Sequence, residues 1–222
     1  MFSVMILAAG GSTRMGGVNK QLLTLCGETV IHRSARAFCG LEKIEEVVVV
    51  CRPGDLPLLE KELAGLPVRV IPSGGETRQQ SVENTLPLLS ARSTHLAIHD
   101  GARPLVRRED ILAVLEAAEK QGGALLGVMA RDTIKVVRDG MVVETPDRRH
   151  LFVAQTPQAF RMDSYKAAMA EAAARGLDFT DDAQLFEQTG RPVAAVPGHS
   201  DNIKITTPED IPLAEGMLSA ME

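Results

Sequence analysis

The sequence contains little cysteine and shows no pairing pattern for the cysteines that it has. Its three cysteines, Cys26, Cys39 and Cys51, stand far apart along the chain. Disulfide scaffolds and zinc sites need paired spacings, and the sequence therefore fits neither class. We interpret the three residues as buried thiols in a reducing compartment, and this predicts a cytoplasmic protein.

Long hydrophobic runs and an excess of positive charge are also missing. The apolar run at residues 4–7 is too short for a signal peptide, and no later run approaches the length of a membrane span. The 24 basic residues are scattered and outnumbered by 29 acidic ones, so the net charge is −5 and nothing favours nucleic-acid binding. No low-complexity linker divides the chain, which predicts a single domain over residues 1–222.

The most informative segment that is present is a glycine-rich loop near the amino terminus. Residues 4–7 have strand length, and the chain continues as Ala8-Ala9-Gly10-Gly11-Ser12-Thr13-Arg14-Met15-Gly16-Gly17-Val18-Asn19-Lys20. Glycines let backbone N–H groups approach phosphate oxygens, while Arg14 and Lys20 supply positive charge. The pattern favours a nucleotide-triphosphate loop whose cations suit the charge that develops on a reacting phosphorus.

This loop has plainer interpretations. A glycine-rich turn after a first strand often serves only to turn the chain. The segment is not a Walker loop, because no Gly-Lys-Ser/Thr follows, and Gly10-Gly11 lacks the third glycine of a dinucleotide oxidoreductase. A non-catalytic nucleotide-binding module would be marked by loss of Arg14 or Lys20, and both are present.

Strand and helix patterns alternate along the rest of the chain. Their order predicts an α/β fold with a Rossmann-like, mostly parallel sheet, helices on both faces, and ligands at the carboxyl ends of the strands. Strands are expected at residues 4–7, 47–50, 68–71, 96–98, 125–129, 151–154, 193–196 and 202–205. Helices are expected at residues 29–39, 53–64, 107–121, 162–175 and 183–188, in a short helix beginning within 73–82, and after Thr207 as a cap with Pro208 in the first position.

A second glycine-rich turn, residues 73–82, follows the predicted strand 68–71. Gly75, Arg78 and Ser81 in this turn are candidates for contact with a base or its phosphates. The alternative is that the glycines only turn the chain and that Ser81 caps or solvates a helix. The choice stays open from these residues alone.

Asp100 ends another predicted strand, at residues 96–98. This is where an α/β enzyme holds a metal, its waters or a sugar hydroxyl, although an aspartate here could also cap the next turn. The neighbouring His99 is interpreted as a satisfied core histidine. Lys204 alternates with two isoleucines, so its side chain should point away from theirs, toward a cleft or toward solvent.

Residues 133–144 form the strongest short-range hairpin signal in the chain. Two alternating segments flank an Asp-Gly turn at Asp139-Gly140. A hairpin inserted into a parallel domain needs a cover, and a second copy of the chain would supply one. We therefore expect a dimer formed through a β-arm at about residues 133–155. The basic cluster that follows, with Arg148, would suit an anionic substrate or simply be solvated.

Taken together, these segments resemble the 2-C-methyl-D-erythritol 4-phosphate cytidylyltransferase family over nearly all of the chain. Each motif is weak alone, and their shared order makes the resemblance specific. The motifs are Leu7-Ala8-Ala9-Gly10 with Arg14 and Asn19-Lys20-Gln21, Gly74-Gly75-Glu76-Thr77-Arg78 with Ser81-Val82, His99-Asp100-Gly101-Ala102-Arg103-Pro104, Arg131-Asp132-Thr133, Asp147-Arg148, Gln155-Thr156-Pro157-Gln158, Thr180-Asp181-Asp182, and Asp201-Asn202-Ile203-Lys204.

The resemblance implies transfer of CMP from CTP to methylerythritol phosphate, with magnesium and with release of pyrophosphate. It implies that the catalytic residues are Arg14, Lys20, Arg148 and Lys204. Nucleotide contacts would come from Ala8, Ala9, Gly10, Gly11, Gly75, Arg78, Ser81, Asp100 and Gly101. Acceptor contacts would come from Asp100, Arg103, Thr133, Arg148, Thr180 and Lys204, with Arg103, Thr133 and Arg148 reaching in from a dimer partner. No protein ligand of magnesium is predicted, because triphosphate and water would bind the ion chiefly.

Three positions depart from the family pattern. Ser12 stands where a glycine is frequent, Asn19 where a proline is frequent, and Gly101 where an alanine is common. The rival within the same fold is a ribitol-5-phosphate cytidylyltransferase, which would use the same cations. The segments Asp147-Arg148 and Asp201-Asn202-Ile203-Lys204 favour the methylerythritol phosphate enzyme.

Overall fold

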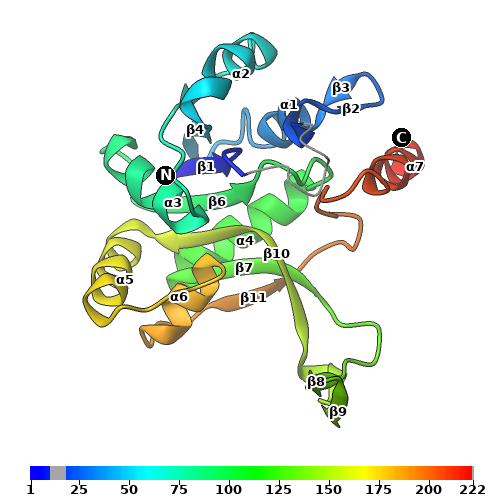
Figure 1. Cartoon of the computed structure of the whole chain (residues 1–222). Coiled ribbons are helices and arrows are strands. Elements are labelled where there is room, and N and C mark those ends of the chain that lie inside the picture. The colour runs from blue at the N-terminus through cyan, green and yellow to red at the C-terminus, as the bar shows by residue number, and fades with distance from the viewer. Residues whose placement is uncertain (11–18, 222) are drawn as a thin grey trace.

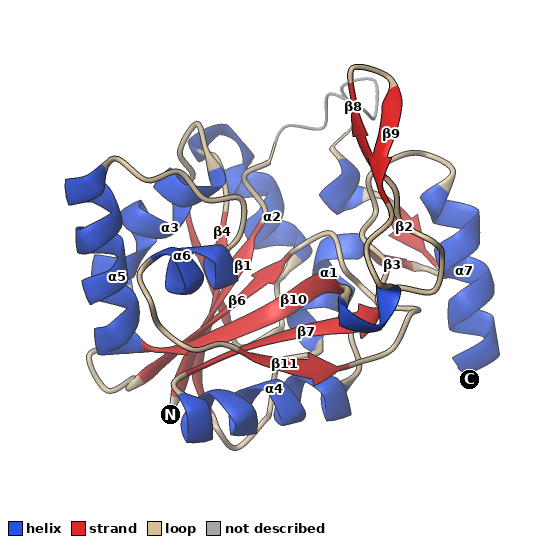
Figure 2. Cartoon of the chain, turned by 90° about the horizontal axis from the view of Figure 1, so that it is seen from below, coloured by secondary structure: helices blue, strands red, loops and turns tan. Residues whose placement is uncertain are grey.

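A seven-stranded, mostly parallel sheet forms the centre of the molecule (Figures 1 and 2). The structure, a computed structural model, describes residues 1–10 and 19–221. Only β10 runs against its neighbours, β6 and β7. In sheet order the strands are β11 (Ala194–Pro197), β7 (Gly123–Met129), β10 (Phe152–Arg161), β6 (His95–Asp100), β1 (Phe2–Leu7), β4 (Ile44–Val50) and β5 (Val68–Ile71).

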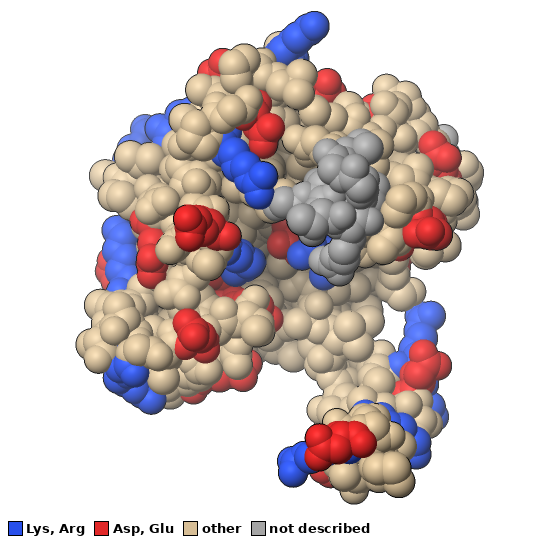
Figure 3. All heavy atoms as spheres, in the orientation of Figure 1, with Lys and Arg blue, Asp and Glu red and all other residues tan. Residues whose placement is uncertain are grey.

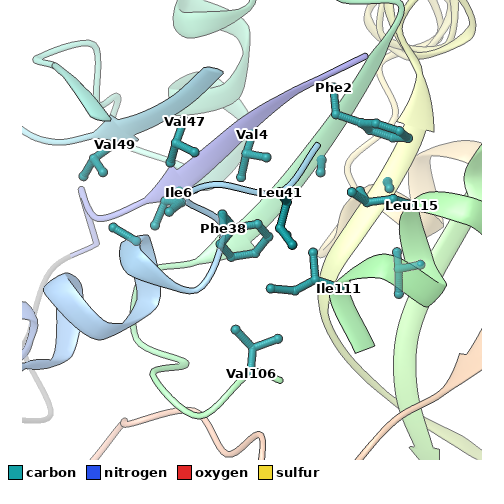
Figure 4. Packing of buried hydrophobic residues seen from close by; sticks show 14 of the residues in the cluster. Phe2, Val4, Ile6, Phe38, Leu41, Val47, Val49, Val106, Ile111 and Leu115 are labelled. Carbon is teal, nitrogen blue, oxygen red and sulfur yellow. The ribbon is translucent and has the colours of Figure 1, made fainter. Parts of the chain in front are cut away.

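Helices cover both faces of this sheet, as the alternation of strand and helix patterns predicts. Successive side chains of β1 point to opposite faces, so Val4 and Ile6 pack in one core and Met5 packs in the other. The first core holds α1 (Val30–Arg36), α2 (Leu56–Glu62) and α4 (Arg108–Gln121), and part of it is drawn in Figure 4. The second core holds α3 (Arg78–Thr85), α5 (Met162–Arg175) and α6 (Asp182–Gln188).

Side chains fix several of the predicted helix starts. Thr29 caps α1, because its Oγ1 accepts a hydrogen bond from the backbone N–H of His32. Asp181 caps α6 in the same way, because its carboxylate accepts a hydrogen bond from the backbone N–H of Gln184. Residues 53–64 are a 3-10 turn, Pro53–Asp55, followed by α2, rather than one helix.

Three predicted boundaries are wrong at the carboxyl-terminal end. The short strand expected at 151–154 continues as β10 to Arg161, because it pairs with two neighbouring strands. Residues 202–205 form no strand. Bonds to two other segments hold them instead: Arg103 Nη1 donates to Asn202 O, Asn202 Nδ2 donates to Thr156 O, and the Ile205 N–H donates to Ala102 O. The last helix, α7 (Asp210–Met221), begins three residues after Thr207, and the Asp210 carboxylate accepts from the N–H of Thr207.

The predicted hairpin is confirmed as β8 (Val136–Arg138) and β9 (Met141–Glu144). Asp139 and Gly140 both have positive φ, as a tight two-residue turn of this kind requires. The hairpin stands at the end of an arm that extends away from the sheet in Figure 1. Large apolar side chains on it are exposed, among them Met141 at 70% and Val142 at 59%.

A short two-stranded ribbon and three more 3-10 turns complete the described chain. A two-stranded ribbon, β2 (Thr24–Leu25) with β3 (Glu28–Thr29), packs with α7 around a third apolar cluster. Further 3-10 turns lie at Lys20–Leu22, Leu86–Leu88 and Arg148–His150. Among the helices of residues 1–10 and 19–221, none has the length and apolar character needed to cross a membrane.

Candidate active site

A pocket opens at the carboxyl ends of β1 and β6, where the parallel order of the strands predicts a ligand site. Figure 3 shows basic and acidic atoms inside the hollow at the centre of this face. Four cations line the pocket and two carboxylates accompany them, which suits a ligand with several negative charges. The lining residues are Leu7, Ala9, Gly10, Lys20, Gln21, Arg52, Gly75, Glu76, Thr77, Arg78, Ser81, Asp100, Ala102 and Lys204.

Asp100 stands on the floor of the pocket as the last residue of β6. Its Oδ2 accepts from Lys204 Nζ at 2.8 Å and lies 3.4 Å from Arg103 Nε. Burial alone would raise the pKa of this carboxyl, but Lys204, Arg78 and Arg103 outweigh burial and hold the pKa well below its usual range. Asp100 is therefore ionised at neutral pH, and Lys204 faces the cleft rather than plain solvent.

The neighbouring His99 is the core histidine that the sequence predicts. It is fully buried, its Nε2 lies 3.2 Å from the carbonyl oxygen of Arg103, and its Nδ1 lies 3.0 Å from Thr156 Oγ1. A carbonyl can only accept, so Nε2 carries the proton and Nδ1 accepts from the threonine hydroxyl. Thr156 Oγ1 in turn accepts from the backbone N–H of Asp100. This network ties the end of β6 to β10.

His99 should make folding stability dependent on pH. Burial lowers its pKa to about 4, against an unfolded value near ~6.5. Since the unfolded chain binds the extra proton between these values, stability falls as pH drops from 6.5 to 4, by about 3 kcal/mol for this group. His99→Gln keeps the donor toward Arg103 and should flatten the dependence in urea melts. A curve as steep as that of the parent chain would contradict this assignment.

The second glycine-rich turn packs against the residues that follow β1 and β4. Gly74 N–H donates to the carbonyl oxygen of Cys51 at 2.9 Å, and Gly75 N–H donates to Ser81 Oγ at 3.0 Å. Ser81 Oγ also donates to Thr77 O, so the hydroxyl organises the turn while lining the pocket. A Cβ on Gly74 would lie 2.7 Å from Cys51 O and even closer to Ala9 Cβ. The absence of a side chain here lets three segments meet.

Gly74→Ala should therefore disturb the pocket. The added methyl has no room, so we expect a loss of about 1–3 kcal/mol in unfolding free energy, as for other overpacked sites, together with weaker binding of the nucleotide triphosphate that the sequence predicts. Denaturant melts and calorimetric titration measure the two effects. Gly54→Ala is the matched control, because a Cβ at Gly54 meets nothing within 4 Å. Equal behaviour of the two variants would contradict the packing argument.

Lys20 and Arg52 line the pocket from two different segments of the chain. Lys20 Nζ donates to the carbonyl oxygen of Ile205 at 3.1 Å, and Arg52 Nε donates to the carbonyl oxygen of Ala9 at 2.8 Å. Gln21 Oε1 is buried with no hydrogen-bond partner among the described residues. Sequence reasoning missed Arg52 and Gln21 as pocket residues. Gln21 falls within the Asn19-Lys20-Gln21 motif, whereas no motif points to Arg52.

The structure brings together eight of the residues that the sequence nominates. Lining the pocket are Ala9, Gly10, Lys20, Gly75, Arg78, Ser81, Asp100 and Lys204. Directly behind this lining are Ala8, Gly101 and Arg103, all packed into the protein, and Arg103 Nη1 bonds to Asn202 O in its own chain. Away from the pocket are Thr133, Arg148 and Thr180. Outside the described residues are Gly11, Ser12, Thr13 and Arg14.

Comparison with known proteins decides between the interpretations of this pocket. The family model described as 2-C-methyl-D-erythritol 4-phosphate cytidylyltransferase matches residues 2–220. The chain belongs to this family. Membership confirms the predicted resemblance and the predicted enzyme class, a nucleotidyltransferase that uses CTP. It sets aside the dinucleotide oxidoreductase and the non-catalytic binding module.

Individual members of the cytidylyltransferase family are similar to this chain along nearly their whole length. The enzyme so named from Pelotomaculum thermopropionicum is 42% identical over 99% of this chain and 95% of its own. A solved 4-diphosphocytidyl-2C-methyl-D-erythritol synthase from Anaerococcus prevotii has a TM-score of 0.88 at 31% identity, covering 99% and 96% of the two chains. The cytidylyltransferase structure from Thermus thermophilus has a TM-score of 0.82 at 35% identity, covering 98% of each chain. These structures share the predicted fold.

Proposed function

We propose that this cytidylyltransferase transfers CMP from CTP to 2-C-methyl-D-erythritol 4-phosphate and releases pyrophosphate. The observation that carries the proposal is a pocket at the strand ends in which Lys20, Arg78 and Lys204 converge beside Asp100 in a chain of this family. The acceptor is named by the family and its relatives, and the pocket supplies the charge that such a reaction needs.

The reaction joins two anions, and neutralisation of charge is the main demand on the protein. A phosphate dianion is already a nucleophile, so little proton transfer is needed and positioning dominates. Lys20 would stabilise the negative charge that builds up on the α-phosphate as pyrophosphate leaves, together with Arg14 from outside the described residues. The contact of Lys20 with the Ile205 carbonyl, which restrains the ammonium group, supports this role.

The nucleotide would lie against the two glycine-rich segments. Backbone groups of residues 8–11 and the turn at Gly75 are assigned to the base, ribose and phosphates, with the Ser81 hydroxyl and Arg78 at the same wall. Ser81 donates its only proton to Thr77 O and accepts from Gly75 N–H, and thus a free lone pair remains for a donor on the ligand. Gly101 would act by close packing behind the floor.

The acceptor would lie on the side of Asp100 and Lys204. Lys204 is 40% exposed and joined to Asp100, so it can reach a phosphate from a fixed base. We assign Arg148, Thr133 and Thr180 to the acceptor as well. Arg103 is 12% exposed and bonded within its own chain, and we place it behind Asp100 rather than reaching across from a partner.

Magnesium fits this donor set. The described residues hold no group of three His, Cys, Asp or Glu that could bind a metal by themselves. Protein sites for Mg²⁺ beside nucleotides commonly use one or two carboxylates and complete the shell with phosphates and water. Triphosphate and water would still hold the ion chiefly, and the Asp100 carboxylate in the pocket lining would complete its shell. When bound, the ion would neutralise the charge of the triphosphate.

We further propose that the chain works as one domain and as a homodimer through the arm that carries β8 and β9. Large exposed side chains support this use of the arm, namely Val137, Met141, Val142, Val143 and Val153. Arg148 lies where this arm returns to the sheet, outside its own pocket, and donates to the carbonyl oxygen of Arg131 at 2.7 Å. A dimer would bring Arg148 and Thr133 to the pocket of the partner.

Pyrophosphate release tests the proposed reaction. Purified protein with CTP, Mg²⁺ and 2-C-methyl-D-erythritol 4-phosphate should release pyrophosphate in step with formation of the cytidine diphosphate ester. A panel of other sugar-alcohol phosphates, each assayed with all four nucleotide triphosphates, supplies the controls. Turnover with ribitol 5-phosphate alone would show that the rival acceptor is correct.

A further inference from the structure

A buried carboxylate joins three helices at the edge of the pocket. Arg78 opens α3 and lines the pocket, and its guanidinium donates to Oδ2 of Asp182, which opens α6 104 positions later in the chain. Asp182 is fully buried. Its other oxygen, Oδ1, accepts from the hydroxyl of Tyr165 in α5 at 2.6 Å. Both carboxylate oxygens are therefore used, one on each side.

The bonds of Asp182 serve to place Arg78 more than to stabilise the fold. A buried carboxylate is expensive to desolvate, and an apolar residue in its place is often no less stable. Burial would lower the pKa of Arg78, but Asp182 beside it raises the pKa above its ordinary value. Asp100 on the pocket floor acts on the same guanidinium and lies within its electrostatic reach. Asp182 thus holds the cation in place by a direct hydrogen bond, and Asp100 adds a longer-range attraction.

A fixed cation differs chemically from a mobile one. Arg78 is 28% exposed at the pocket wall, near Lys204 and Lys20, so a bound polyphosphate would meet its charge. A charge already in place needs no reorganisation as the transition state forms, and displacement by about 1 Å can cost a hundredfold in rate. Tyr165 is held in the apolar core among Phe160 and Phe186, which makes it a rigid support.

We propose that Asp182 is a positioning residue for nucleotidyl transfer: it holds the Arg78 guanidinium at the pocket wall, and the Tyr165 hydroxyl orients its carboxylate. The inference rests on the proposed function. It assigns a catalytic consequence to residues 165 and 182, neither of which touches the pocket itself.

Asp182→Asn tests the proposal, because the amide keeps the shape and the acceptor for Tyr165 but removes the anion that faces Arg78. We expect kcat to fall about tenfold to a hundredfold. The calorimetric Kd for CTP should change by less than about threefold, since Arg78 keeps its charge and ground-state binding is largely preserved. Tyr165→Phe should lower kcat in the same direction by a smaller factor. Glu171→Gln is the matched control, because Glu171 is likewise a carboxylate paired with arginine, here with Arg175 and Arg191 at the surface, and its loss should leave kcat unchanged.

A double substitution separates positioning from a general loss of stability. If Asp182 acts only through Arg78, Arg78→Gln and the pair Arg78→Gln with Asp182→Asn should have the same kcat. The pair should also melt at a higher temperature than Arg78→Gln, because no unpaired carboxylate stays buried.

Two results would overturn the inference. One is multiplicative loss of kcat in the pair. The other is an Asp182→Asn protein that melts earlier but turns over like the parent. The parent chain assayed in parallel keeps these outcomes separate from failure of the proposed function, in which the parent itself would form no product.

Discussion

Replacing Lys20 with alanine should lower kcat about a hundredfold or more, the effect expected when a preorganised transition-state contact is removed. Lys20 lines the pocket and its Nζ is restrained by the carbonyl oxygen of Ile205, so the ammonium group is in place before the substrate arrives. The KM for CTP should rise much less than kcat falls, because the contact matters most when charge has built up on the α-phosphate. Steady-state pyrophosphate release with both substrates varied measures the two constants.

Two controls frame this experiment. Lys20→Arg keeps the positive charge and should recover part of the rate that Lys20→Ala loses. If Lys20 acted only through its shape, Lys20→Arg would be no more active than Lys20→Ala. Lys120→Ala removes another lysine that is paired with Glu116 on the exposed face of α4, and it should leave kcat unchanged. A Lys20→Ala enzyme with the parental kcat would remove this residue from the mechanism.

Mixing two inactive variants should restore activity if the arm completes the partner's pocket. Arg148→Ala and Lys204→Ala should each lower kcat about a hundredfold as homodimers. In mixed dimers one site has both substitutions and the other has neither. Random exchange would therefore restore about a quarter of the parental activity, as expected for a symmetric dimer with two shared sites. The measurement is turnover after the two chains are unfolded together and refolded.

The geometry of Arg148 makes this test informative. The residue is exposed at the base of the arm and does not line its own pocket, while Lys204 is joined to Asp100 inside it. Tagged chains would prove that mixed dimers have formed. If proven mixed dimers recovered no activity, both residues would belong to a site within one chain.

Local patterns in the sequence predict most of this fold because they report directly on burial. The valine run of β4 is apolar throughout, and a strand covered on both faces requires this. The Asp139-Gly140 turn predicts the hairpin because few other residues tolerate two successive positive φ angles. Asp100 is found because a charged residue at a strand end lies where the parallel order places ligands, and Lys20 is found because it supplies positive charge after a glycine-rich loop.

The sequence fails where distant partners decide the structure. Residues 202–205 alternate like a strand but form none, and Asn202 fixes the segment by donating to the carbonyl oxygen of Thr156. Likewise, the pairing of Arg78 with Asp182 joins residues 104 positions apart, and no periodicity reports such a contact. Arg52 enters the pocket because its guanidinium donates to the carbonyl oxygen of Ala9, just beyond β1, and the packing of β4 beside β1 sets this contact.

A crystal structure of the protein with CTP bound tests the central claim most directly. That claim is that the pocket at the ends of β1 and β6 holds a nucleotide triphosphate with Lys20 on its phosphates. We expect the cytosine against the turn at Gly75 and Ser81, and Lys20 Nζ within hydrogen-bond distance of a phosphate oxygen. Triphosphate bound elsewhere, or Lys20 turned away from it in the complex, would contradict the account.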